Sequence, residues 1–376
     1  MKSAFVFSEL FEFFRAHDGY PWMFSRSRAA FDLCRANNFL DREDISIVSP
    51  EPAARNELEV YHSKAYLDLL QKANTGVFEE FMLKSGIGTL ECPVYRGCFD
   101  YHSLAVGATM KAAELLNSGG RDVVFSPTGG FHHAGPDFAS GFCYLNDVNV
   151  TLALLVEKGL RVFYVDIDVH HGDLVQEAWY EDDRVFTMSF HESGKTLFPW
   201  NSGFEAEIGK GKGRGFCVNV PLPAETGDEP YVWAFSALFP PLLKAFNPDL
   251  VMAVIGADTL HSDPNSHLLL STEGYCRVVE LIARQGRKIA AIGGGGYNLD
   301  STSRAWTLAW AILNGFSIED ENEFLYGGQF RGDRIASLHD RPLFIPTETR
   351  DRTRRECERI VSYIEKNVFP IHGLKD

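Results

Sequence analysis

Short runs of consecutive apolar residues alternate along this chain with longer segments in which apolar residues recur every three or four positions. The first pattern is typical of strands buried on both faces, and the second is typical of helices that bury one side. Their alternation predicts an α/β fold, in which helices cover both faces of a parallel sheet. The predicted strands are residues 122–126, 161–166, 184–190, 250–255 and 288–292, and the predicted helices are residues 104–116, 145–158, 231–246, 273–285 and 301–314.

One predicted helix carries a conflict, because residues 231–246 contain Pro240 and Pro241. Proline lacks the amide donor and its ring clashes with the preceding turn, so we expect a break or a kink there. No repeat, linker or low-complexity segment divides the chain, and we interpret residues 1–376 as one domain. In such sheets ligands bind at the carboxyl ends of the strands, so the residues after each strand are the candidates for function.

The strand at residues 161–166 runs into a segment in which polar and apolar side chains alternate. Asp166, Asp168 and His170 occupy every second position, so an extended backbone points them the same way. Two converging carboxylates repel each other unless a cation or a proton lies between them. The pattern predicts a divalent-metal site, since a solvated acidic turn does not explain the interleaved Ile167 and Val169.

Asp258 follows the strand at residues 250–255. Alone, an aspartate in this place is often a helix N-cap. With Asp168 and His170 it completes a set of one imidazole and two carboxylates. That set suits catalytic Zn²⁺, or a similar ion such as Fe²⁺, with a position left open.

Two more strand ends carry candidate catalytic groups. His132 and His133 follow the first predicted strand, and Asp166 and Asp173 could each orient one of these rings. A histidine paired with a carboxylate is typical of a general acid or base. The last predicted strand runs into four glycines and Tyr297. That hydroxyl could face a developing oxyanion, and the glycines fit no phosphate-binding or dinucleotide fingerprint.

The chain is strongly acidic, with 36 lysine and arginine residues against 51 aspartate and glutamate residues and a net charge of −15. This charge argues against general binding to nucleic acid or to anionic membranes, which favour a basic surface. A cationic substrate or partner suits it, and solubility alone explains it equally well. Residues 351–359 are densely charged, and we interpret them as a solvated helix face, with a partner site as the alternative.

Seven widely spaced cysteines with no C-x-x-C pair predict reduced thiols rather than a disulfide framework or a zinc ribbon. The N-terminal segment carries Glu9 and Glu12 and does not resemble a signal peptide. No apolar run approaches the roughly 20 residues that a membrane helix needs. We therefore expect a cytoplasmic protein that binds neither membranes nor nucleic acid, and the sequence does not determine its oligomeric state.

Six segments together resemble the histone deacetylases, and most closely the class I branch and its bacterial acetoin-utilization-type relatives. Within residues 88–315 they follow the family's order: GGFHHA, ASGFCYLNDV, DIDVHHGD, GKGKGRGFCVNVPLP, GADTLHSDP and GGGGYN. The resemblance implies the arginase/deacetylase fold, a single α/β domain with a parallel sheet of about eight strands. It also implies a zinc-dependent hydrolase that removes acetyl groups from Nε-acetyl-lysine. The first 85 residues match poorly, and we expect them to form part of the rim.

Transferred residue by residue, the resemblance implies a role for each motif residue, and places Arg26 near an inner product-release cavity. The implied residues are Asp168, His170 and Asp258 for zinc; His132, His133, Asp166, Asp173 and Tyr297 for catalysis; Gly141, Phe142 and Phe198 for the acyl-lysine channel; Glu91 for the substrate backbone; and Asp166, Ser189 and the backbone carbonyls of Asp168, His170 and Phe190 for a structural potassium ion.

The chain departs from the family pattern at two rim positions. Glu91 is one methylene longer than the family's aspartate, and Asn265 stands where class I members carry leucine or methionine, which makes that wall of the substrate pocket more polar. The basic tail and co-repressor features of nuclear members are not evident, so histones are not the substrate we expect.

Four functions compete for these motifs. The first is deacetylation of acetyl-lysine in proteins, and the second is hydrolysis of acetylpolyamines or other small amides. The third, a dinuclear manganese enzyme like arginase, is disfavoured because Leu260 stands where a further acidic ligand is needed. The fourth is an acyl-lysine-binding protein without activity, against which the intact metal, histidine and tyrosine set argues.

Overall fold

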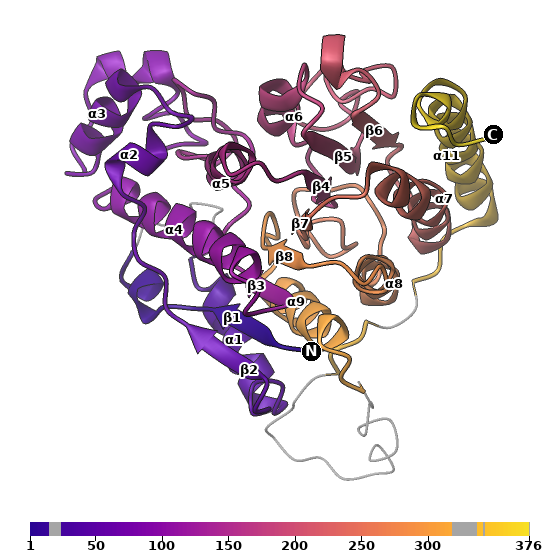
Figure 1. Cartoon of the computed structure of the whole chain (residues 1–376), viewed down its shortest axis with the longest axis horizontal. Coiled ribbons are helices and arrows are strands. Elements are labelled where there is room, and N and C mark those ends of the chain that lie inside the picture. Colours follow the sequence, from indigo (N-terminus) through magenta and orange to yellow (C-terminus); the bar gives the residue numbers. More distant parts are fainter. Residues whose placement is uncertain (15–23, 318–336, 341–342, 376) are drawn as a thin grey trace.

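The computed structural model describes residues 1–14, 24–317, 337–340 and 343–375, in which eight parallel strands form one sheet (Figure 1). Its strand order is β2-β1-β3-β8-β7-β4-β5-β6. The strands are β1 (Ser3–Val6), β2 (Ile45–Val48), β3 (Val123–Ser126), β4 (Val162–Asp166), β5 (Val185–Glu192), β6 (Cys217–Leu222), β7 (Leu250–Val254) and β8 (Ile289–Ile292).

Helices connect these strands. The α-helices are α1 (Arg26–Ala36), α2 (Arg55–Leu58), α3 (Lys64–Ala73), α4 (Cys98–Asn117), α5 (Asp147–Glu157), α6 (Asp173–Trp179), α7 (Asp228–Phe246), α8 (Thr272–Ala283), α9 (Leu299–Leu313) and α11 (Thr347–Asn367). Short 3₁₀ helices lie at Glu9–Phe13, Glu80–Ser85, Gly211–Gly213 and Phe369–His372.

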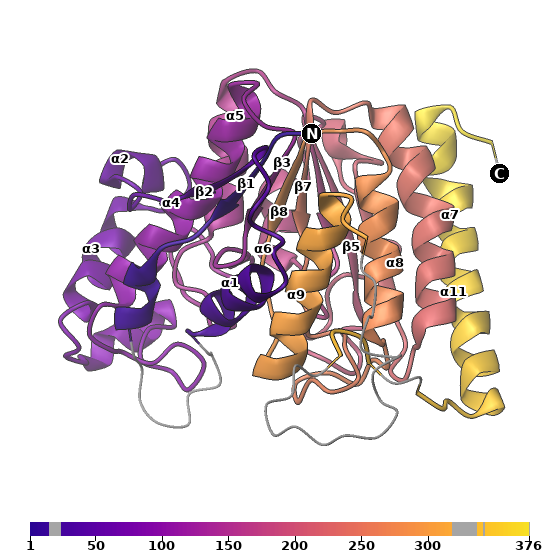
Figure 2. The same cartoon turned by 90° about the horizontal axis from the view of Figure 1, so that it is seen from below.

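Two hydrophobic cores lie on opposite faces of the sheet because successive side chains of a strand alternate in direction. Phe163 and Val165 of β4 belong to the core shared with α1, α7, α8, α9 and α11. Val162 and Tyr164 belong to the core shared with α3, α4 and α5. Figure 2 shows α8 and α9 side by side over the first of these faces. Because both faces are covered, every residue of β4 is buried, which explains why its sequence contains no charged residue before Asp166.

The predicted α/β class and parallel sheet are confirmed, and all ten predicted elements are present. Nine of them end within three residues of their predicted bounds, whereas α4 begins at Cys98, six residues before the predicted start. Of the two outcomes expected at Pro240 and Pro241, the break does not occur, because α7 continues through both prolines. Leu242 and Leu243 beside them are buried, so packing against the core holds this turn. Ser236 and Ala237, whose carbonyls have no amide donor at the prolines, are an exposed and a half-buried residue.

All seven cysteines belong to the described residues. Each one is buried, and none forms a disulfide, as predicted. In the described residues, no helix is both long enough and apolar enough to cross a membrane.

The strand order explains where a site can form. The neighbours β3, β8, β7 and β4 occupy the middle of the sheet, and all four are parallel. Their carboxyl ends therefore meet at one edge, and the four motif-bearing loops follow these same ends. The four loops that follow β3, β4, β7 and β8 are far apart in the sequence but therefore lie close together at this edge.

Candidate active site

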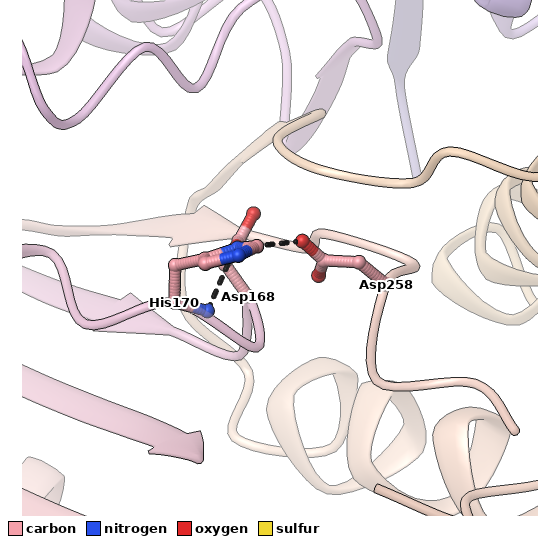
Figure 3. A group of neighbouring side chains, drawn as sticks. All are labelled: Asp168, His170 and Asp258. Atoms are coloured by element: carbon pink, nitrogen blue, oxygen red, sulfur yellow. Dashed lines mark hydrogen bonds and ion pairs between the residues drawn. The ribbon is translucent and has the colours of Figure 1, made fainter. Parts of the chain in front are cut away.

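Three potential metal ligands converge at this edge from two loops. Asp168 and His170 follow β4, and Asp258 reaches them from the loop after β7 (Figure 3). His170 Nδ1 lies 3.1 Å from Asp168 Oδ1 and 3.0 Å from Asp258 Oδ2. One ligand atom from each residue lies within 4.8 Å of the others, as the sequence pattern predicts.

Backbone amides hold the two carboxylates in place. Val169 N donates to Asp258 Oδ1 at 2.9 Å, and Gly295 N donates to Asp168 Oδ2 at 2.5 Å. A Cβ atom on Gly295 would lie 1.9 Å from Asp258 Oδ2. The loop after β8 therefore needs glycine there, because its backbone closes directly over the carboxylates.

The electrostatics of this group favour a cation. Burial, and then the charge of Asp168, raise the pKa of Asp258 to about 7. Burial lowers the pKa of His170, but its hydrogen bonds to Asp168 and Asp258 outweigh that effect and raise it to about 10. Two buried carboxylates thus compete for one imidazole proton, which a bound divalent ion would replace. One nitrogen and two oxygen donors fit such an ion.

The tandem histidines form a chain of buried contacts beside this group. His132 Nδ1 lies 2.8 Å from Asp166 Oδ2, and His133 Nδ1 lies 2.8 Å from Asp173 Oδ1. The two Nε2 atoms lie 2.9 Å apart. Each histidine therefore pairs with the acid that the sequence analysis expects.

The two imidazoles differ in pKa. Burial lowers the pKa of His132, but the charge and hydrogen bond of Asp166 outweigh it and raise the value to about 9. Burial, and then the charges of His132 and His170, hold the pKa of His133 well below its usual 6.5. At neutral pH, His132 therefore carries a second ring proton, whereas the ring of His133 is neutral.

Tyr297 lies at the end of the glycine loop, just before α9. Its amide donates to Asp263 Oδ2 at 2.6 Å, and its ring centroid lies 6.3 Å from that of His170. Burial, and then the charges of Asp258 and Asp168, hold its pKa well above 10, so the hydroxyl keeps its proton. Arg26 is buried next to this loop and donates to Gly296 O at 2.8 Å.

The predicted channel residues surround the histidines. The Phe198 ring centroid lies 5.1 Å from that of His133, and the Phe142 ring centroid lies 5.6 Å from that of Tyr297. Glu91 is exposed, and its Oε2 accepts from Gly141 N at 3.2 Å. These residues come from three separate loops, and the structure brings them together.

Gly141 occupies a position that only glycine fits. Its φ is +53°, and a Cβ atom would lie 2.7 Å from His133 Cδ2 and 3.0 Å from Phe198 Cε1. We expect Gly141→Ala to displace the imidazole and to lower kcat/KM by about 100-fold, the order of loss for a misplaced catalytic group. The measurement is kcat/KM on an acetyl-lysine peptide, the substrate that the family resemblance implies, with thermal unfolding to verify folding.

Gly286→Ala is the matched control for this prediction. Gly286 has a φ of +62°, but nothing lies within 4 Å of its added Cβ atom. This variant carries the backbone cost without the contact, so its kcat/KM should stay within about twofold of the wild type. Equal losses in both variants would show that backbone strain, and not the imidazole, decides the effect.

Asn265 lies near the tyrosine loop through a shared carboxylate. Its amide donates to Asp263 Oδ1 at 2.9 Å, and Asp263 also holds the amide of Tyr297. The side chain of Asn265 is half-buried.

The first 85 residues, which we expect to form part of the rim, contact one of the channel loops. Ser85 O accepts from Ala139 N at 2.9 Å, so part of this segment packs against the loop that continues to Gly141.

The residues expected to bind potassium are adjacent in the sheet. Ser189 of β5 pairs in register with Asp166 of β4, which brings their side chains to one level. Ser189 Oγ lies 2.8 Å from His191 Nδ1, and Asp166 Oδ1 accepts from Asp168 N at 3.0 Å. The backbones of His170 and Phe190 continue the same two chain segments.

The sequence analysis missed residues that shape these loops. Asp147 is fully buried and accepts from Gly130 N at 2.9 Å and Phe131 N at 2.7 Å, so it fixes the turn that leads to the histidines. The Asn146 side chain donates to His132 O at 3.2 Å and caps α5. Both stand in the motif LNDV, where a polar pair after an apolar stretch was the available signal.

Comparison with known proteins identifies the class. The sequence profile of the histone deacetylase domain matches residues 21–313. The histone deacetylase clr6 of Schizosaccharomyces pombe is 34% identical over 87% of this chain and 80% of its own. A putative histone deacetylase 2 of Caenorhabditis elegans is 36% identical over 70% of this chain, which spans only about half (52%) of that relative. The crystal structure of an HDAC homolog from Aquifex aeolicus has a TM-score of 0.83 and 30% identity, with 96% of this chain and 100% of that one covered.

The chain belongs to the histone deacetylase family, and it is a hydrolase of the deacetylase type. Its fold is the arginase/deacetylase fold, as the resemblance implies. The match to the family profile begins at residue 21, so it includes most of the first 85 residues, which carry none of the six family motifs. Within these residues, α3 packs in the core that it shares with α4, and no short motif signals this packing.

Proposed function

We propose that this protein is a zinc-dependent deacetylase of Nε-acetyl-lysine in proteins, which releases acetate. The observation that carries the proposal is the pair of histidine–aspartate contacts beside the convergent Asp168, His170 and Asp258. We also propose that residues 1–376 act as one cytoplasmic catalytic domain. The single sheet that supplies all the site loops supports the one-domain part of this proposal.

The metal would be held by Asp168 Oδ1, His170 Nδ1 and Asp258 Oδ2. When bound, Zn²⁺ would supply a Lewis acid for the amide carbonyl and lower the pKa of water, and Fe²⁺ has compatible ligand preferences. Leu260 is buried and offers no ligand for a second ion, which argues against a dinuclear centre.

The histidines move the protons. His133 Nε2, neutral because burial lowers its pKa, takes the proton of the attacking water. His132, held protonated by Asp166, stabilises the negative charge that develops nearby. His133 then returns its proton to the leaving lysine amine, so one residue acts first as base and then as acid.

Tyr297 and the channel act on the substrate. The Tyr297 hydroxyl donates to the oxyanion of the tetrahedral intermediate, which its raised pKa permits. Phe142 and Phe198 enclose the apolar stem of the acyl-lysine, Gly141 leaves it room, and Glu91 accepts from the peptide backbone. The Asn265 amide would make that wall of the pocket more polar.

A potassium ion is proposed behind the site, bound by Asp166, Ser189 and the carbonyls of Asp168, His170 and Phe190. The register of β4 and β5 supports this set. It would stabilise the loop that carries the metal ligands, because two of its five members stand in that loop and a third, Asp166, ends the strand before it.

Acetylpolyamine hydrolysis is the second candidate. The observation that favours it is the exposed Glu91 carboxylate at the channel loop, in a chain of net charge −15. A carboxylate there could bind the distal ammonium of a small amine as readily as a peptide amide.

The test compares kcat/KM for an acetyl-lysine peptide and for an N-acetylated polyamine on zinc-loaded protein. We expect the peptide to be preferred, and Tyr297→Phe to lower kcat/KM by about 100-fold or more on either substrate. Preference for the polyamine would replace the proposed substrate. Unchanged turnover by Tyr297→Phe would remove the hydroxyl from the mechanism.

A further inference from the structure

A cavity of about 510 Å³ lies outside the active site, between α11 and the loop that follows β5. Its lining is rich in cations: Lys195 from the loop, and Arg352, Arg355 and Arg359 from the helix, with Glu356 as the single acid. Such a concentration of positive charge is unusual in a chain of net charge −15. Four of the lining residues belong to the densely charged segment 351–359. The sequence analysis interprets this segment as a solvated helix face, with a partner site as the alternative.

The helix presents these arginines together because of their spacing. Arg352, Arg355 and Arg359 stand three and four residues apart, which puts them on one face of α11. The opposite face buries Cys357 and Ile360 in the core. The backbone that carries the guanidinium groups is therefore anchored by hydrophobic packing.

Ion pairs orient the outer two arginines. Arg352 contacts Glu225 at 2.6 Å, and Arg359 contacts both Glu205 at 2.6 Å and the lining residue Glu356 at 2.7 Å. The pair of Arg352 and Glu225 is exposed and contributes little to stability, so an anion can compete for the Arg352 guanidinium group. Between them, Arg355 has no hydrogen bond or ion pair to any residue that the structure describes.

The remaining lining determines what kind of anion fits. Pro221 and Pro223 supply an apolar surface next to the cations, and Lys195 and Thr196 border it from the loop. Guanidinium groups bind phosphate oxygens through pairs of parallel hydrogen bonds, and several cations suit an anion with more than one charge. We propose that this cavity binds a small organic phosphate, with its phosphate at Arg355 and its organic part against the prolines.

One loop carries both lining residues of the cavity and a residue of the active site. Leu197 N donates to Ser193 O at 3.1 Å, and Asn201 N donates to Gly194 O at 3.0 Å, so the loop is closed on itself. Lys195 and Thr196 line the cavity on this loop, and Phe198 follows within two residues. The proposal concerns binding alone, and it does not depend on the deacetylase function.

The test is isothermal titration of the full-length, metal-loaded protein with AMP and with inorganic phosphate. We expect AMP to bind more tightly than inorganic phosphate, because only AMP has an organic part for the prolines. Arg355→Glu should weaken AMP binding by at least about 10-fold, and Arg355→Gln should weaken it less. Circular dichroism verifies that both variants fold.

Arg350→Glu is the matched control, because it makes the same change of charge on the same helix outside the cavity. Its AMP affinity should stay within about twofold of the wild type. Absence of AMP binding at millimolar concentration would overturn the proposal. So would an equal loss in Arg350→Glu, which indicates a diffuse electrostatic effect, or no loss in Arg355→Glu, which places the phosphate elsewhere.

Discussion

Asp258→Asn is expected to abolish stoichiometric metal binding and to lower kcat/KM by roughly 1,000-fold or more. The substitution keeps the size of the side chain and removes its charge, so the loss is that of a metal ligand. A catalytic metal contributes several kcal/mol of transition-state stabilisation, and about 4 kcal/mol corresponds to a factor of roughly 1,000. Metal content by mass spectrometry after dialysis and kcat/KM on an acetyl-lysine peptide are the two measurements.

Asp263→Asn is the matched control for metal content. Asp263 is a second buried acid near the site, but its oxygens accept from the amides of Tyr297 and Asn265, and it is not part of the convergent group. This variant should keep its metal even if the tyrosine loop shifts and activity falls. Full metal content in Asp258→Asn would contradict the ligand set.

The unfolding temperatures of the metal-free proteins give a further measurement, in which Asp258→Asn should not lower stability. In the wild type without metal, Asp168 and Asp258 are two buried carboxylates that share one imidazole. Removing one charge relieves their repulsion. Metal-free Asp258→Asn should therefore unfold at the same temperature as metal-free wild type or at a higher one, whereas the metal-loaded wild type should exceed both.

The centre of this site was open to prediction because its residues are positioned by strands. Asp166 ends β4, and Asp168 and His170 continue its alternation, so the two-residue period of an extended chain predicts their convergence. Asp258 follows β7, a neighbour of β4, and adjacency of strand ends was a sound expectation for a parallel sheet. Local geometry and one topological rule were sufficient here.

The channel was not open to prediction in that way. Gly141, Phe142 and Phe198 lie in loops whose conformations depend on distant contacts, such as that of Gly141 with His133. Only the family resemblance pointed to them. Asp147 was missed for a related reason, because a buried acid that satisfies backbone amides cannot be distinguished from a helix-starting aspartate by sequence alone.

One edge of the sheet, strand β2, was missed because its pattern is weak. Strand β2 is only partly buried, and its four residues are too short to show a period. A break at Pro240 and Pro241 fails to occur for the opposite reason, since a strong local signal is overridden by the packing of Leu242 and Leu243. Local propensity fails in both directions where tertiary contacts decide.

His133→Ala is expected to lower kcat by a factor of about 100 to 10,000, the range for removal of a general acid–base group. Metal content should not change, because His133 is outside the convergent group of Asp168, His170 and Asp258. That combination distinguishes a proton-transfer role from a role in holding the metal. Retention of most activity with intact metal would show that another group accepts the proton.

The pH profile tests the same assignment without a substitution. Burial raises the pKa of Asp173 to about 6, so this acid takes up a proton as pH falls through 6 and no longer supports the His133 imidazolium that forms in the reaction. His132, whose pKa is raised to about 9, loses its charge as pH rises through 9. The plot of kcat/KM against pH should therefore be bell-shaped with limbs near 6 and 9, because kcat/KM reports the free enzyme. Asp173→Asn should flatten the acid limb of this profile, and His132→Gln should flatten the alkaline limb. A limb that persists in the corresponding variant would show that another residue is responsible for that ionisation.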